Sequence, residues 1–192
     1  MKIETEITVL VKTSYDNLKK ELLSKEFEIK EEYEVNDDYL IDSKLNLSNM
    51  SNLDILKKCI LVRDVVGIEK ELLYKYKEYD SNGDIIKQGK VKCPIMDTSK
   101  AIDFMMAIDY KKLFSIHDKC IVFANDRTQI IVQLINNKYI FIEMESTGEF
   151  INREYINVEE MKEDLLSYNL PIDSSNFFAK KAEIILNEVL NK

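Results

Sequence analysis

The first stretch of the chain, Lys2 to Lys12, alternates between apolar and polar positions with a period of two. This period is typical of a β-strand that buries one face. The polar face carries Glu4 and Glu6, which lie side by side on such a strand. Two carboxylates that close repel each other unless a cation lies near them, and hard divalent cations prefer carboxylate oxygen. The pattern leaves two interpretations open: the solvated face of an edge strand, or one wall of a metal site.

The rest of the pattern divides the chain into further strands and helices. Extended patterns predict strands at residues 27–42, 59–66, 69–79, 85–95, 113–124, 127–134 and 138–145. Helical spacing and capping residues predict helices from Ser14 to Lys25, from Thr98 or Ser99 to Tyr110, from Val158 to Tyr168, and from Ser174 or Ser175 to Leu190. The polar segment from Ser43 to Asp54 is predicted to be a loop, and Asn82-Gly83 marks a tight hairpin turn.

These elements add up to about eight strands, mostly joined as hairpins, and three or four helices. Hairpin connections make strands antiparallel, so the sequence predicts an α+β fold, as a closed eight-stranded antiparallel β-barrel. A chain of 192 residues is expected to form a single domain, with the barrel at about 2–150 and C-terminal helices at about 156–191. The amphipathic last helix favours packing on the outside of the barrel over docking to a partner.

Composition and charge narrow the classes of function. The chain is 45% hydrophobic and 32% charged, as in ordinary globular proteins. No apolar run reaches the roughly 20 residues of a membrane span, and the chain begins without a signal-peptide core, so we expect a cytoplasmic protein that binds no membrane. The net charge of −8 disfavours nucleic-acid binding. The sequence leaves the oligomeric state open, with a homodimer among the alternatives.

The cysteines and the histidine suggest no catalytic centre of their own. Cys59, Cys93 and Cys120 are far apart and form no C-x-x-C pair, so we expect no zinc site. The single histidine, His117, has no obvious partner in the sequence. General base work is therefore left to a carboxylate, a lysine or a metal-bound water.

A second Glu-x-Glu pair, Glu143 and Glu145, ends the last predicted strand. The strands between the two acidic pairs carry cations, several of them two residues apart: Arg63, Lys75, Lys77, Lys90, Lys92 and Lys119. Burying such charges inside a small barrel costs folding free energy unless the interior contains water or holds a charged ligand. Carboxylate pairs together with basic residues suit a polyphosphate chain bridged by Mg²⁺ or Mn²⁺. The alternative is a barrel with an apolar filling and these charges outside.

Five short motifs, in order between Lys2 and Phe150, resemble the CYTH domain. This is the fold of the triphosphate tunnel metalloenzymes, which include class IV adenylate cyclases, thiamine triphosphatases and inorganic triphosphatases. The motifs are Ile3-Glu4-Thr5-Glu6, Asp38-Tyr39-Leu40-Ile41-Asp42, Ile60-Leu61-Val62-Arg63, Leu72-Leu73-Tyr74-Lys75 and Phe141-Ile142-Glu143-Met144-Glu145. The resemblance implies a closed tunnel in which acidic pairs hold metal and basic residues hold a triphosphate.

The resemblance also implies roles for single residues. The metal-side residues, for Mg²⁺ or Mn²⁺, would be Glu4, Glu6, Glu143 and Glu145. The phosphate contacts would be Arg63, Lys75 and Lys119, with Lys77, Lys90, Lys92 and Arg127 as further substrate-binding residues. The catalytic group would be Glu4, Glu6 and Lys75, acting on a small phosphorylated ligand.

Three positions depart from the family pattern. Thr8 stands in place of the signature lysine, Leu61 in place of the first arginine of a pair, and Gln133 in place of an aspartate. The changes at Thr8 and Leu61 remove two positive charges that would bind or orient the substrate, and the change at Gln133 removes a negative charge directed at the metal. The sequence therefore predicts metal-dependent binding and hydrolysis of inorganic triphosphate or a small organic triphosphate. It leaves open a non-catalytic phosphate- or nucleotide-binding module and a class IV-type adenylate cyclase.

Overall fold

The computed structural model describes residues 6–79 and 85–191, with the side chains of residues 77–79 and 85–88 left out. Contacts divide the described residues into two compact units. Of the described residues, unit 1 contains 35–79, 85–117 and 181–191, and unit 2 contains 6–34 and 118–180. Two long strands run through both units, and the expected single domain stays a prediction.

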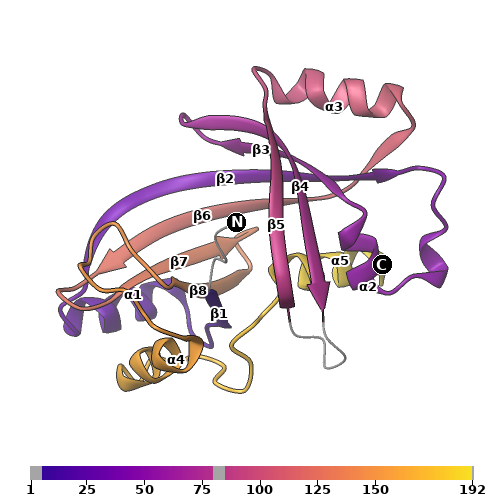
Figure 1. The fold of residues 1–192 in the computed structure, drawn as a ribbon. Coiled ribbons are helices and arrows are strands. Elements are labelled where there is room, and N and C mark those ends of the chain that lie inside the picture. Colours follow the sequence, from indigo (N-terminus) through magenta and orange to yellow (C-terminus); the bar gives the residue numbers. More distant parts are fainter. Residues whose placement is uncertain (1–5, 80–84, 192) are drawn as a thin grey trace. The chain divides into compact units, whose positions relative to one another are not determined.

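Two runs of three consecutive strands are separated by one helix, and two helices follow the last strand (Figure 1). The strands are β1 (Glu6–Leu10), β2 (Glu28–Asp42), β3 (Ile60–Val65), β4 (Glu69–Tyr79), β5 (Ile85–Pro94), β6 (Tyr110–Ala124), β7 (Gln129–Ile135) and β8 (Tyr139–Glu145). The helices are α1 (Tyr15–Ser24), α2 (Asn52–Lys57), α3 (Thr98–Ala107), α4 (Val158–Ser167) and α5 (Lys181–Leu190), with a 3₁₀ turn at Leu47–Asn49. None of these described helices has the length and apolar character that crossing a membrane requires.

The strands form one eight-stranded sheet in the order β1-β8-β7-β6-β2-β3-β4-β5. The pairings are antiparallel, and together with the helices they confirm the predicted α+β class. Strands β1 and β5 stand at the two ends of this order and do not pair with each other among the described residues. The predicted closing of the sheet into a barrel is therefore wrong.

The outer edge of β1 shows why the sheet does not close through that strand. Residues 171–179, here called the edge segment, lie along it. Thr8 N–H donates to the carbonyl of Phe177 at 2.9 Å, and Lys12 N–H donates to the carbonyl of Pro171 at 2.7 Å. A strand offers hydrogen-bonding groups on only two sides, and β8 takes the other side of β1. No further strand can pair with β1 while the edge segment lies there.

The same contacts correct the start of the last helix. The sequence predicts a helix from Ser174 or Ser175, but α5 begins at Lys181. The intervening residues first turn, with Asn176 N–H donating to the carbonyl of Asp173 at 3.4 Å, and then bridge to Thr8 in parallel. Pairing with an open strand edge overrides the helical spacing, which the sequence alone could not show.

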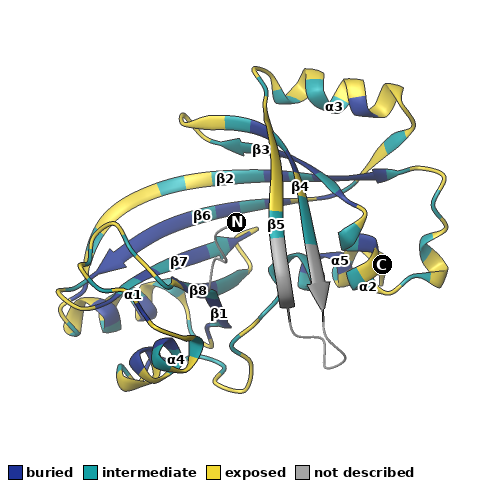
Figure 2. Cartoon of the chain, in the orientation of Figure 1, coloured by how far each residue is buried: buried dark blue, intermediate teal, exposed yellow. Residues whose placement is uncertain are grey.

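The core of unit 2 lies on the apolar face of β1, β8, β7 and β6. Its fully buried strand residues include Ile7, Val9, Ile121, Phe123, Ile130, Val132, Ile142 and Met144. Helix α1 adds Leu18 and Leu22, and α4 adds Met161 and Leu165. Ser14 caps α1 by accepting from the N–H of Asn17, as predicted. Figure 2 shows β1, β7 and β8 as mostly buried or half-buried strands.

Unit 1 has a smaller core beneath α3, in which Leu40, Val62 and Met105 are buried. Helix α3 contacts β3 and β4 (Figure 1). Helix α2 begins within the segment predicted to be a loop, Ser43 to Asp54, and ends beyond it at Lys57. It is a six-residue helix capped by Ser51, and it buries only Ile55, so its hydrophobic signal was too short to detect.

Candidate metal centre

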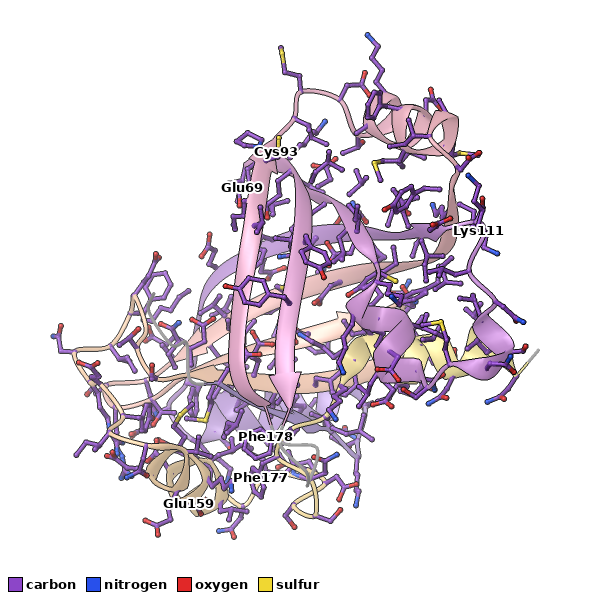
Figure 3. The ribbon with its side chains drawn as sticks, turned by 45° about the vertical axis from the view of Figure 1, so that its right-hand side comes forward. Glu69, Cys93, Lys111, Glu159, Phe177 and Phe178 are labelled. Atoms are coloured by element: carbon purple, nitrogen blue, oxygen red, sulfur yellow. The ribbon has the colours of Figure 1, made fainter. Side chains whose placement is uncertain are left out.

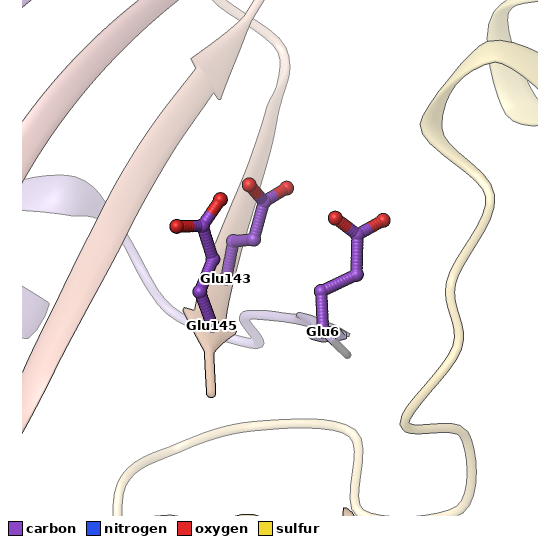
Figure 4. Close-up of side chains that lie close together, drawn as sticks. All are labelled: Glu6, Glu143 and Glu145. Carbon is purple, nitrogen blue, oxygen red and sulfur yellow. The ribbon is translucent and has the colours of Figure 1, made fainter. Parts of the chain in front are cut away.

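Three glutamates from β1 and β8 lie together on the polar face of unit 2. The β1–β8 pairing sets Glu6 opposite Glu145 and Thr8 opposite Glu143. One carboxylate oxygen from each of Glu6, Glu143 and Glu145 lies within 4.8 Å of the others. Figure 4 shows the three carboxylates pointing to the same side of the two strands. We call this group the glutamate triad.

The apolar face of the same strands sets the position of the triad. Ile7 and Val9 of β1 and Ile142 and Met144 of β8 alternate with the polar positions and are all buried. A slip of one residue would turn these side chains outward and bring glutamates into the core. The hydrophobic pattern thus fixes the register that brings Glu6 to the β8 glutamates.

The donor set of the triad fits a hard divalent cation. It consists of carboxylate oxygen only, which is the ligand type that Mg²⁺ and Mn²⁺ prefer. Glu6 and Glu143 are half-buried and Glu145 is exposed. Solvent access on one side suits Mg²⁺, which usually keeps several water ligands. The fourth predicted metal residue, Glu4, lies outside the described residues.

Neighbours of the triad include residues that the sequence did not single out. Burial raises the pKa of Tyr33, and the neighbouring Cys120, Glu143 and Asp118 raise it further. Tyr33 therefore remains a protonated phenol near Glu143 at neutral pH. A tyrosine in an alternating strand carries no distinctive signal, so only the structure could place it here.

Two of the three departures from the family pattern, Thr8 and Gln133, lie on the sheet face that carries the triad. Thr8 lies opposite Glu143, and only 6% of the surface of Thr8 is exposed. Gln133 pairs with Phe141, two residues from Glu143 along β8, and is 5% exposed. Both are neutral, so the negative charge of the triad is not offset at these two positions.

The two predicted phosphate contacts in unit 2 are not brought to the triad. Cys120 of β6 pairs with Gln133 and so lies on the triad's face of the sheet. The side chain of its neighbour Lys119 points to the opposite face. Its ammonium group lies 3.8 Å from the carboxylate of Glu32. Arg127 lies in the turn between β6 and β7 and forms an ion pair with Asp164 of α4.

Asp164 is the centre of a second charged group in unit 2. Its carboxylate is buried and accepts hydrogen bonds from the hydroxyls of Thr128 at 2.5 Å and Tyr155 at 2.6 Å. Arg127 and Arg153 form ion pairs with the same carboxylate. Burial raises the pKa of Asp164, but these hydrogen bonds and positive charges outweigh it and leave the pKa below its ordinary value.

In unit 1, Arg63 is held by a two-pronged ion pair. Its Nε and Nη2 donate to the two carboxylate oxygens of Asp37 at 2.7 and 2.6 Å. Both side chains are largely buried, with 21% and 9% of their surface exposed. Burial lowers the pKa of Arg63, but the hydrogen bonds and charge of Asp37 outweigh it and raise the pKa. This guanidinium is already neutralised within unit 1.

Three other predicted phosphate contacts in unit 1, Lys75, Lys90 and Lys92, share the sheet face of Arg63. Lys75 pairs directly with Lys90 across β4 and β5. Lys92 lies 3.2 Å from the carboxylate of Glu71, which is buried and stands opposite Arg63 on β4. Two like charges in direct cross-strand pairing are unfavourable and suit a face that receives an anion. The side chain of Lys77 lies outside the described residues.

The third departure, Leu61, is also on this face of unit 1. It is 2% exposed and pairs with Tyr39 and Leu73, both buried. Leu61 therefore fills an apolar site between aromatic and aliphatic neighbours. Within unit 1 the structure groups Arg63, Lys75, Lys90 and Lys92 on one sheet face. Within unit 2 it groups Glu6, Glu143 and Glu145.

Comparison with known proteins gives a likeness in fold. Neither a protein-family model nor a curated protein matches the chain. A conserved hypothetical protein from Pyrococcus furiosus has a similar structure, with a TM-score of 0.62 at 15% identity, covering 93% of this chain and 99% of that one. A provisionally named adenylate cyclase from Vibrio parahaemolyticus has a TM-score of 0.58 at 13% identity, covering 100% of this chain and 99% of that one.

A third similar structure is a provisionally named adenylyl cyclase from Hippeastrum, described as having a dominant triphosphatase activity. Its TM-score is 0.62 at 12% identity, and the match covers 97% of this chain and 96% of that one. At these identities the likeness is one of fold. The arrangement of strands and helices is thus one that adenylate cyclase-like and triphosphatase-like proteins also have.

Proposed function

We propose that this protein binds a divalent metal, Mg²⁺ or Mn²⁺, at the glutamate triad and uses it to bind and hydrolyse inorganic triphosphate or a small organic triphosphate. The observation that carries the proposal is the convergence of Glu6, Glu143 and Glu145, with carboxylate oxygens within 4.8 Å of one another. The fold supports it, because a similar structure belongs to a protein with triphosphatase activity.

Each group of residues would have a distinct task. A bound divalent ion supplies charge neutralisation for phosphoryl oxygens. Glu6, Glu143 and Glu145 would hold that ion through carboxylate oxygen, with Glu4 as a further ligand. The half-buried position of Glu143 also lets it accept a proton from, and so orient, an attacking water.

The basic residues would act by charge. Lys75, Lys90 and Lys92 share one face of unit 1 and would contact phosphate oxygens, with Lys75 as the catalytic cation. Cations that meet developing negative charge lower the barrier of phosphoryl transfer. Arg63, whose charge is balanced by Asp37, would support this face through its position. Lys77 completes the predicted set.

A second candidate function is a non-catalytic module that binds a phosphorylated ligand. It is favoured by the ion pairs that already engage predicted phosphate contacts, namely Arg63 with Asp37, Lys119 with Glu32 and Arg127 with Asp164. A cation that must first leave a carboxylate contributes less to catalysis. The class IV-type cyclase is a third candidate, supported by the fold alone.

One experiment separates these candidates. Purified protein is incubated with inorganic triphosphate, thiamine triphosphate and ATP, each with Mg²⁺ or Mn²⁺, and the products are identified. Phosphate release that is lost in Glu143→Gln supports hydrolysis. Cyclic nucleotide with pyrophosphate selects the cyclase, and ligand-dependent thermal stabilisation without product selects the binding module. Absence of any reaction or stabilisation contradicts all three.

A further inference from the structure

The edge segment, residues 171–179, makes regular backbone contacts along the outer edge of β1. The carbonyl of Thr8 accepts from the N–H of Ala179 at 2.9 Å, and the N–H of Thr8 donates to the carbonyl of Phe177 at 2.9 Å. The carbonyl of Leu10 accepts from the N–H of Asp173 at 2.7 Å. These bonds use the alternate backbone groups of β1 that point away from β8.

Side chains fasten the edge segment to unit 2 on both sides. The ammonium group of Lys12, just beyond β1, lies 3.2 Å from the carboxylate of Asp173. The ammonium group of Lys162 on α4 lies over the rings of Phe177 and Phe178, at 5.6 and 5.3 Å from their centroids. Figure 3 shows both phenylalanines beside α4, near Glu159. The segment is thus held by β1 and α4 together.

The edge segment is hydrogen-bonded to Thr8, which is the residue of β1 opposite Glu143 of the triad. Thr8 lies two residues from Glu6 on the same face of β1 and directly opposite Glu143. Both of its backbone hydrogen-bonding groups are taken by the edge segment. Strand β1 is held by β8 on one side and by the edge segment on the other, so loss of the edge segment would let the strand fray around Glu6 and Thr8. Fraying there would move the Glu6 carboxylate relative to Glu143 and Glu145.

We infer that the edge segment is a positioning element for the metal centre, which fixes β1 so that Glu6 stays within ligand distance of the β8 glutamates. This inference rests on the proposed metal binding at the triad. By linkage, the coupling runs both ways: a bound metal also stabilises the edge segment on β1. The metal affinity of the triad would therefore depend on residues that do not touch the metal.

The direct test removes one hydrogen bond between the segment and β1. Ala179→Pro deletes the N–H that Thr8 accepts from, because proline has no amide hydrogen. Ser174→Pro is the matched control, since Ser174 holds the second position of the Asp173–Asn176 turn, where proline is favoured. No hydrogen bond from its N–H is found among the described residues. Mn²⁺ affinity is measured by calorimetric titration of both variants and the wild type.

We expect Ala179→Pro to weaken Mn²⁺ binding about tenfold and Ser174→Pro to leave it within about twofold of wild type. Equal affinity of Ala179→Pro and wild type would overturn the inference and leave the proposed function intact. So would an equal loss in both variants. Failure of the wild type to bind Mn²⁺ would instead overturn the proposed function itself.

A second measurement covers the case in which Ala179→Pro does not fold. Amide hydrogen exchange of the wild type is followed with and without Mg²⁺. The N–H groups of Thr8, Asp173 and Ala179 should exchange more slowly with Mg²⁺, while amides of α3 in unit 1 should not change. A merely structural segment would show no such dependence. Unchanged exchange at Thr8 and Ala179 in a protein that binds Mg²⁺ would contradict the inference.

Discussion

The charged side chains around Arg63 in unit 1 and those of the glutamate triad in unit 2 are arranged in opposite ways. In unit 1, Arg63 lies against Asp37 and Lys92 lies against Glu71, so opposite charges are paired where they are buried. In unit 2, Glu6, Glu143 and Glu145 gather like charges within 4.8 Å. Repulsion of this kind costs stability in a folded protein and is retained where a cation offsets it. The contrast marks the triad as the place where a ligand is expected.

The strongest way to break this contrast is to remove one carboxylate of the triad. We expect Glu143→Gln to lower metal-dependent phosphate release about a thousandfold, because the amide keeps the shape but loses both the charge that holds the metal and the oxygen that takes a proton from the attacking water. The rate is measured with inorganic triphosphate at saturating Mn²⁺. Glu159→Gln, an exposed position on α4, serves as the control and should keep wild-type activity. Equal rates for Glu143→Gln and wild type would show that the triad is not the metal centre.

Breaking the Arg63–Asp37 ion pair of unit 1 should lower the stability of the protein. Asp37→Ala leaves the largely buried guanidinium of Arg63 without its partner, and we expect a loss of about 3 kcal/mol in the free energy of unfolding. Urea denaturation measures it. A double variant, Asp37→Leu with Arg63→Met, should recover most of the loss, since replacing both charges by apolar groups removes the uncompensated charge. A small loss in Asp37→Ala would mean that Arg63 is free to serve a ligand.

Asp164 sharpens the comparison, because it is a paired carboxylate in the same unit as the triad. Its folded pKa is lowered, so it contributes stability above its unfolded pKa, about 3.9, and that stability is lost as the pH falls through the folded pKa. We expect Asp164→Asn to be less stable than wild type by about 2 kcal/mol at pH 7. The difference should shrink below about pH 4. Urea denaturation at several pH values tests this, and a difference that does not change with pH would contradict it.

The smallest effect should come from the exposed member of the triad. Without metal, Glu145→Gln removes one repulsion opposite Glu6, so we expect the apoprotein to gain about 0.5 kcal/mol. The gain should disappear when Mg²⁺ is present, because the lost ligand then weakens metal stabilisation. Thermal unfolding with and without Mg²⁺ measures both. A loss of stability without metal would show that Glu145 has a structural role.

The hydrophobic pattern predicted much of the fold and part of the site. Period-two alternation located β1 and β8 and set Glu6, Glu143 and Glu145 on polar faces, and the structure brings these three together. Strand pairing was the part that local pattern could not determine. Whether β1 meets another strand or residues 171–179 depends on contacts between residues far apart in sequence, which alternation does not encode.

The same limit applies to the basic residues. Alternation gave the strand faces of Lys75 and Lys90 correctly, and the structure pairs them. It could not reveal that Arg127 would meet Asp164, because the two are distant in sequence and join a turn to a helix. The local sequence pattern predicts on which strand face or in which turn a charged residue lies. Tertiary packing determines with which residue it forms an ion pair.

The central claim is that the glutamate triad holds a divalent metal. The most direct test is a titration of the wild type and of Glu143→Gln with Mn²⁺, in which electron paramagnetic resonance measures the free ion. We expect the wild type to bind Mn²⁺ tightly and Glu143→Gln to bind it with at least tenfold lower affinity. Equal binding by the two proteins, or no binding by the wild type, would contradict it.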